Sequence, residues 1–156
     1  MIEYPKYKKV LFCTDFSENA DYAFNFAHGI ARRDKGVLYI LHVIPPDTYE
    51  LYSYITPEEL ERIKKDMVQD RDYSYAEHYV KHMKDEVKFE IITKSGREDE
   101  EILTFAEQEH VDIIVMGTHG RTGIERVFFG GVAEKVIRHS LCPVFVIPCK
   151  KKRERA

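Results

Sequence analysis

Short apolar runs alternate along the chain with stretches in which apolar residues recur every three to four positions. The runs at 10–13 and 37–44 are almost entirely apolar, which is the pattern of strands buried on both faces. The other predicted elements are strands over 87–93, 112–116 and 143–148, and helices over 18–33, 57–84, 98–109 and about 133–137. Strands alternating with helices form βαβ units. The pattern therefore predicts one doubly wound α/β domain, a parallel sheet with helices on both faces.

Local signals mark the ends of the first two predicted helices. Ser17 is a candidate N-cap for the helix over 18–33, and Gly36 stands where a C-terminal glycine is expected. Thr56, Pro57 and Glu59 form a capping-box sequence with proline at the first helical position. These residue types favour helix boundaries close to 18, 33 and 57.

Two segments are expected at the carboxyl edge of the sheet, where open α/β sheets bind ligands. One is Cys13-Thr14-Asp15 after the first strand, and the other is the glycine-rich segment 117–131 after the fourth. Glycine lets the backbone approach a ligand closely, and exposed backbone N–H groups at a helix N-terminus bind anions. Arg121 adds a positive charge that suits phosphate. The glycines alone leave two alternatives open, a phosphate cradle and a flexible loop.

The spacing Gly117-x2-Gly120-x9-Gly130 resembles the nucleotide-binding signature of the universal stress protein family. The resemblance extends to the strand ending in Thr14-Asp15, to Leu41-His42-Val43 and to the C-terminal segment 136–147. It implies a universal stress domain over 1–149, followed by a basic tail over 150–156. It also implies a five-stranded sheet of order 3-2-1-4-5 and a homodimer formed through strand 144–148.

The resemblance further implies a site for ATP, AMP or another adenine nucleotide, with Mg or Mn as a possible companion ion. Asp15 would hold the ribose, the backbone at Val43 would meet the adenine, and the glycine segment would cradle the phosphates. The implied binding residues are Cys13, Asp15, Val43, Met116, Gly117, His119, Gly120, Arg121, Thr122, Gly130, Gly131 and Val132. In this family a Ser or Thr usually follows the last glycine of the motif, which here is Gly130. Gly131 at that position loses a hydroxyl donor, which weakens phosphate binding by about 0.5–1.5 kcal/mol.

Composition excludes several other classes of function. The net charge of −3 gives no general attraction to nucleic acid. No apolar run reaches the roughly 18–20 residues of a membrane span, and the first residues lack the apolar stretch of a signal peptide. We therefore expect a cytoplasmic protein without membrane contact. Its three cysteines include no C-x-x-C pair, so neither a disulfide framework nor a zinc site is predicted.

Two enzyme classes lack their motifs in this chain. Phosphoryl transfer of the P-loop type needs G-x4-G-K-[ST], which is absent. A dinucleotide fold needs G-x-G-x-x-G directly after the first strand, where this chain has Thr14-Asp15-Phe16. We expect no catalytic residues and at most slow ATP hydrolysis. His119 is expected to be a loop histidine without catalytic duty, and His78 and His82 are expected on a solvated helix face without a metal.

Two functions follow from this reading. The first is a stress-response switch in which an adenine nucleotide orders the segment 117–131 and the ordered face recruits a protein partner. The alternative is a nucleotide-independent dimeric interaction or chaperone-like module of the same fold, which Gly131 favours. Asp15 is ambiguous in the same way, because it is either a ribose ligand or only a turn residue.

Overall fold

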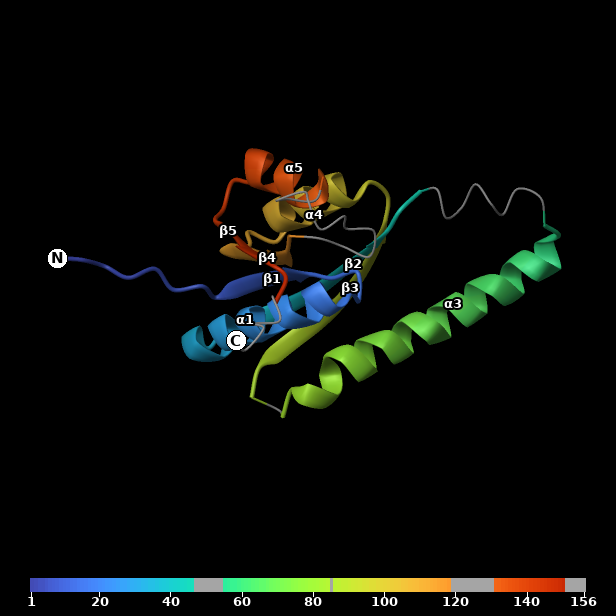
Figure 1. The fold of residues 1–156 in the computed structure, drawn as a ribbon, viewed down its shortest axis with the longest axis horizontal. Helices are drawn as coiled ribbons and strands as arrows, with labels where there is room; N and C mark the ends of the chain where they lie inside the picture. The colour runs from blue at the N-terminus through green and yellow to red at the C-terminus, as the bar shows by residue number, and fades with distance from the viewer. Residues whose placement is uncertain (47–54, 85, 119–130, 151–156) are drawn as a thin grey trace, which may run out of the picture.

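The computed structural model describes residues 1–46, 55–84, 86–118 and 131–150 (Figure 1). Its elements are β1 (Lys9–Cys13), α1 (Glu18–Asp34), β2 (Val37–Ile44), α3 (Pro57–His78), the 3-10 turn η2 (Val80–His82), β3 (Lys88–Ser95), α4 (Glu98–Gln108), β4 (Ile113–Gly117), α5 (Gly131–His139) and β5 (Val144–Ile147). The strands form one five-stranded sheet of order β3-β2-β1-β4-β5, and every neighbouring pair is parallel. The predicted fold class and strand order are confirmed.

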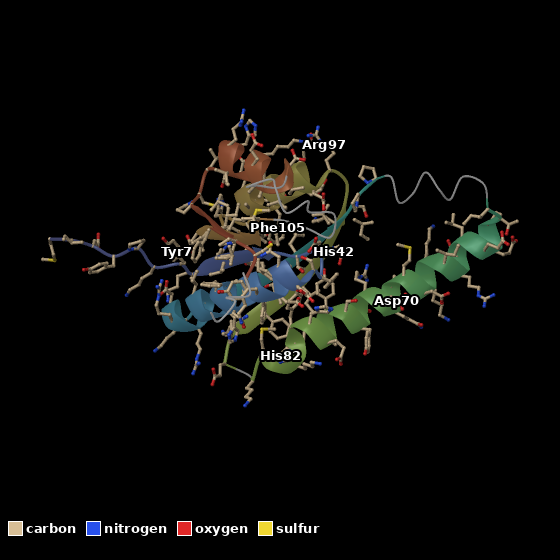
Figure 2. All side chains as sticks on the ribbon, viewed as in Figure 1. Tyr7, His42, Asp70, His82, Arg97 and Phe105 are labelled. Carbon is tan, nitrogen blue, oxygen red and sulfur yellow. The ribbon has the colours of Figure 1, made fainter. Side chains whose placement is uncertain are left out.

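The sheet separates two apolar cores, because successive side chains of a strand point to opposite faces. On β1, Val10 and Phe12 join one core while Leu11 and Cys13 join the other. Figure 1 shows α1 and the C-terminal end of α3 on one side of the sheet, with α4 and α5 on the other. Phe105 of α4 packs on Tyr39 of β2 at a ring distance of 5.4 Å (Figure 2).

The predicted start signals of α1 and α3 are confirmed. The Ser17 hydroxyl accepts from the Ala20 N–H at 3.2 Å, and Thr56 and Glu59 form the reciprocal capping box. The expected role of Gly36 at the end of α1 is wrong, since Lys35 adopts the left-handed conformation with φ 52°. Gly36 serves close packing instead, because a Cβ there would lie 2.6 Å from the Lys8 carbonyl oxygen.

Helix α3 ends at His78 rather than at residue 84, and η2 follows it. Tyr75 is the buried residue of this helix, near its C-terminal end. Figure 2 shows Asp70 on the part of α3 that lies away from the sheet. Only the C-terminal end of α3 therefore belongs to the core. Among the described helices, none has the length and apolar character of a membrane span.

Candidate functional site

The strand order reverses between β1 and β4, and this reversal creates the candidate site. From β1 the chain moves to β2 and β3 on one side, and then returns to β4 and β5 on the other. Phe12 of β1 pairs with Val115 of β4, so the connection after β1, which contains Asp15, and Thr118 after β4 leave the same edge of the sheet. In open α/β sheets this is the position of the ligand crevice.

Asp15 lies in the four-residue connection between β1 and α1. Its Oδ1 atom accepts a hydrogen bond from the Ser17 N–H at 3.0 Å, and Ser17 in turn caps α1. This is an Asx turn, in which a carboxylate stands in for a backbone acceptor. The turn role of Asp15 is therefore present in the structure, and its role toward ribose stays a prediction.

Thr14 anchors this connection through hydrogen bonds on three of its groups. Its N–H donates to the Leu41 carbonyl at 2.9 Å, and its hydroxyl oxygen accepts from the Phe16 N–H at 2.9 Å. Its carbonyl lies 2.8 Å from Nδ1 of His42. A carbonyl can only accept, so Nδ1 of His42 carries the proton. Thr14 and His42 were not predicted as site residues, because only the fold brings their polar groups together.

Gly117, at the end of β4, faces a buried amide. Asn19 of α1 donates through Nδ2 to the Ile147 carbonyl at 3.2 Å, and the Thr118 hydroxyl lies 3.5 Å from its Oδ1. A Cβ atom on Gly117 would lie 2.6 Å from that same Oδ1. Gly117 is therefore required by packing against α1, whether or not a phosphate binds nearby. Asn19 itself gave no recognisable signal in the sequence.

We expect Gly117→Ala to lower the free energy of unfolding by about 1–3 kcal/mol, the usual cost of overpacking a buried site. The Asn19 amide cannot move aside without losing its bond to Ile147. Urea unfolding followed by circular dichroism measures the change. Gly29→Ala is the matched control, because Gly29 is exposed on α1 with no atom near its Cβ position, and it should gain about 0.5–1 kcal/mol. Equal stability of Gly117→Ala and the wild type would contradict the packing role.

A second carboxylate interacts electrostatically with Asp15. Glu98, the first residue of α4, has its pKa raised above the ordinary value, first by burial and then by the Asp15 and Asp99 carboxylates. The surroundings of Asp15 are therefore acidic, which disfavours phosphate and suits groups that donate hydrogen bonds, such as sugar hydroxyls. In the described ranges, no group of three His, Cys, Asp or Glu side chains is arranged to hold a metal ion.

The structure also locates five other predicted binding residues. Cys13, Val43 and Met116 are buried at the carboxyl ends of β1, β2 and β4. Burial raises the pKa of the Cys13 thiol well above its ordinary value, with Cys142 as a second cause, so Cys13 is a packing residue and not a nucleophile. Gly131 and Val132 open α5, and no atom of the described residues lies within 4 Å of the Cβ position of Gly131.

The remaining predicted residues are His119, Gly120, Arg121, Thr122 and Gly130, and they lie outside the described residues. The described binding residues lie at the carboxyl ends of β1, β2 and β4, in the connection after β1 and at the start of α5, and their role in binding a nucleotide stays a prediction. His78 was expected on a solvated helix face, and that expectation is wrong. It is partly buried, and its Nδ1 contacts both carboxylate oxygens of Asp21 at 2.8 and 2.9 Å.

The comparisons with known proteins, by sequence and by structure, point to one family. The universal stress protein family model matches residues 6–148. Universal stress protein MJ0531 of Methanocaldococcus jannaschii is 35% identical over 94% of this chain and 85% of its own length. MJ0577 of the same organism is 34% identical over 92% of this chain and 96% of its own length. The solved structure of MJ0577 has a TM-score of 0.78 and covers 94% of this chain and 99% of its own.

Two more distant solved structures share the fold. A universal stress protein in complex with cAMP has a TM-score of 0.61 and is 19% identical, covering 92% of this chain and 98% of its own. A universal stress protein from Archaeoglobus fulgidus in complex with dAMP has a TM-score of 0.59 and is 20% identical, covering 92% of this chain and 99% of its own.

Proposed function

Because the chain belongs to the universal stress protein family, we propose that it binds an adenine nucleotide, with ATP as the first candidate, at the carboxyl edge between β1 and β4. The observation that carries the proposal is the reversal of strand order at that point. It brings the connection with Asp15 and the end of β4, where the glycine segment begins, to the same edge of the sheet, which supports a shared site for a sugar and a phosphate. Adenine nucleotides bound to two proteins of the same fold support the choice of ligand.

The charge distribution supports one orientation of the proposed nucleotide. The ribose lies toward Asp15, where the neighbouring Glu98 carboxylate makes the crevice unfavourable for phosphate. The phosphates lie toward the backbone N–H groups at the start of α5, since a helix N-terminus carries partial positive charge. The backbone at Val43, at the end of the neighbouring strand β2, lies on the adenine side. A Mg or Mn ion would bind through the phosphates, and the protein supplies no preformed site for it among its described residues.

The proposed role of binding is a switch. Nucleotide would order the segment 117–131 next to α5, and the ordered surface would recruit a protein partner in the stress response. A ligand shifts such an equilibrium only by its difference in affinity for the two states. We further propose a homodimer through β5, an edge strand on which Phe145 is 40% exposed. Pairing with a second copy would remove the unpaired strand edge.

Calorimetric titration of the purified full-length chain with ATP and Mg tests the proposal, with GTP and Mg as the control ligand. We expect ATP to bind and Gly131→Ser to bind it about 2- to 10-fold more tightly, since the added hydroxyl supplies one hydrogen bond. The Cβ position of Gly131 meets no atom of the described residues within 4 Å, so none of them opposes the serine side chain. Nucleotide released from the denatured protein, identified by chromatography, gives an independent measurement. If neither protein binds any adenine nucleotide, the nucleotide-independent interaction module is the correct function.

A further inference from the structure

The connection that carries Asp15 contains a strained residue. Phe16, directly after Asp15, has φ 61°, in the left-handed region that non-glycine residues other than Asn and Asp seldom adopt. Such a conformation persists only when the surrounding structure enforces it. The described contacts of Phe16 therefore show what holds the Asp15 connection in place.

Four aromatic rings surround the side chain of Phe16. Its centroid lies 5.0 Å from Tyr75, 5.7 Å from His78 and 6.0 Å from Tyr79, all at the C-terminal end of α3, and 4.8 Å from His42 of β2. The end of α3 is itself fixed to the body of the protein. The Tyr75 hydroxyl donates to the Ile92 carbonyl of β3 at 3.0 Å.

A hydrogen bond joins the end of α3 directly to the same connection. The Tyr79 hydroxyl and the Thr14 hydroxyl are bonded to each other in a buried position. The Thr14 oxygen also accepts from the Phe16 N–H at 2.9 Å. Tyr79 is thus bonded to the Thr14 hydroxyl, which in turn holds the backbone N–H of Phe16, the residue after Asp15. Its own ring is fixed between Phe12 and Phe24, at centroid distances of 5.2 and 4.7 Å.

We propose that Tyr79 and Phe16 are positioning residues for ribose recognition: the end of α3 holds the connection 14–17 in its strained conformation and so aims the Asp15 carboxylate at the sugar. The proposal rests on the proposed nucleotide function for its ligand. Neither residue touches the nucleotide. They act through the backbone on both sides of Asp15, since Thr14 is bonded to Tyr79 and the Phe16 ring is packed among the rings of α3.

Tyr79→Phe is the test variant, because it removes the hydroxyl bonded to Thr14 and keeps the ring in the core. Tyr39→Phe is the matched control, since Tyr39 is a buried tyrosine of the opposite core, where its ring packs on Phe105 of α4. Each protein is titrated with ATP and with 2′,3′-dideoxy-ATP, which lacks the ribose hydroxyls. Tyr79→Phe should weaken ATP about 2- to 10-fold and leave dideoxy-ATP unchanged, whereas Tyr39→Phe should leave the ratio of the two affinities at the wild-type value. An equal loss for both ligands, or no loss for either, overturns the proposal.

Amide hydrogen exchange in the nucleotide-free protein separates this proposal from the function on which it rests. The Phe16 and Ser17 N–H groups donate to Thr14 and Asp15, so both should exchange several-fold faster in Tyr79→Phe. The Thr118 N–H, bonded to the Ile147 carbonyl at 3.0 Å, is the internal control and should not change. Unchanged exchange at Phe16 and Ser17 overturns the positioning role. If the wild-type protein binds no nucleotide but Tyr79→Phe still shows the faster exchange, the proposed ligand is refuted while the contact from Tyr79 to the connection 14–17 is established.

Discussion

Replacing Phe12 with alanine is expected to lower the free energy of unfolding by about 3–5 kcal/mol, the range found when a large core aromatic side chain is removed. Phe12 lies on the central strand β1 and has no exposed surface. Its ring packs edge to face against Phe24 of α1 at 5.5 Å and against Tyr79 at 5.2 Å. The substitution therefore leaves a cavity where the sheet, α1 and the end of α3 meet.

Urea unfolding measures this loss. An unchanged slope of the free energy of unfolding against urea concentration, the m-value, confirms that the folded state is retained. Tyr4→Ala is the matched control, since Tyr4 is 81% exposed and its removal should change stability by less than about 0.5 kcal/mol. Phe12→Leu leaves a smaller cavity and keeps the comparison possible if the alanine variant does not fold. A loss below about 1.5 kcal/mol for Phe12→Ala would show that the core closes over the missing ring.

Asp15→Ala is expected to weaken ATP binding about 10- to 100-fold, because hydrogen bonds to a charged group contribute about 1.5–3 kcal/mol. The alanine variant also loses the acceptor for the Ser17 N–H at the start of α1. Asp15→Asn separates the loss of the charge from the loss of the Ser17 hydrogen bond, since it removes the charge and keeps an oxygen acceptor for Ser17. Titration calorimetry with ATP and dideoxy-ATP measures both variants, and the loss should be confined to ATP.

The same variants provide a measurement that needs no nucleotide. The Asp15 carboxylate is one of the causes that raise the pKa of Glu98, after burial. Removing the Asp15 charge should therefore move the pKa of Glu98 back toward its ordinary value, which a carbon-detected NMR titration reports. If Glu98 responds in this way but Asp15→Asn and Asp15→Ala bind ATP like the wild type, Asp15 is a turn residue and not a ribose ligand.

The secondary structure was largely predictable because its signals are local. The apolar run of residues 10–13 became β1, buried on both faces, and the capping box of Thr56 and Glu59 began α3 where expected. The end of α3 was not predictable in the same way. Apolar residues continue at helical spacing beyond His78, but Tyr79 turns into the core beside Phe12 and Phe24, and that contact depends on the packing of three elements.

The candidate site was predictable in its location and less so in its composition. Asp15 and the glycine segment stand out as residue types after predicted strands, and the parallel sheet brings the ends of those two strands, β1 and β4, to one edge. The partners that shape the site gave no such signal. Glu98 is one of several acidic residues at the start of a helix, a pattern that gives no hint of its electrostatic interaction with Asp15. Gly117 was assigned to phosphate, although Asn19 already requires a glycine there.

By itself the sequence determined which segments are strands and helices, which strands are buried on both faces, and which edge of the sheet carries polar and glycine residues. Periodicity and capping depend on neighbours within a few positions, so the order of residues contains them. Only the tertiary structure decided that Tyr79 bonds to Thr14, that Asn19 fills the space beside Gly117, and that Phe16 adopts a left-handed conformation. Each of these features depends on contacts between elements that are far apart in the chain. Those contacts form because the strand order brings the elements to the same edge of the sheet.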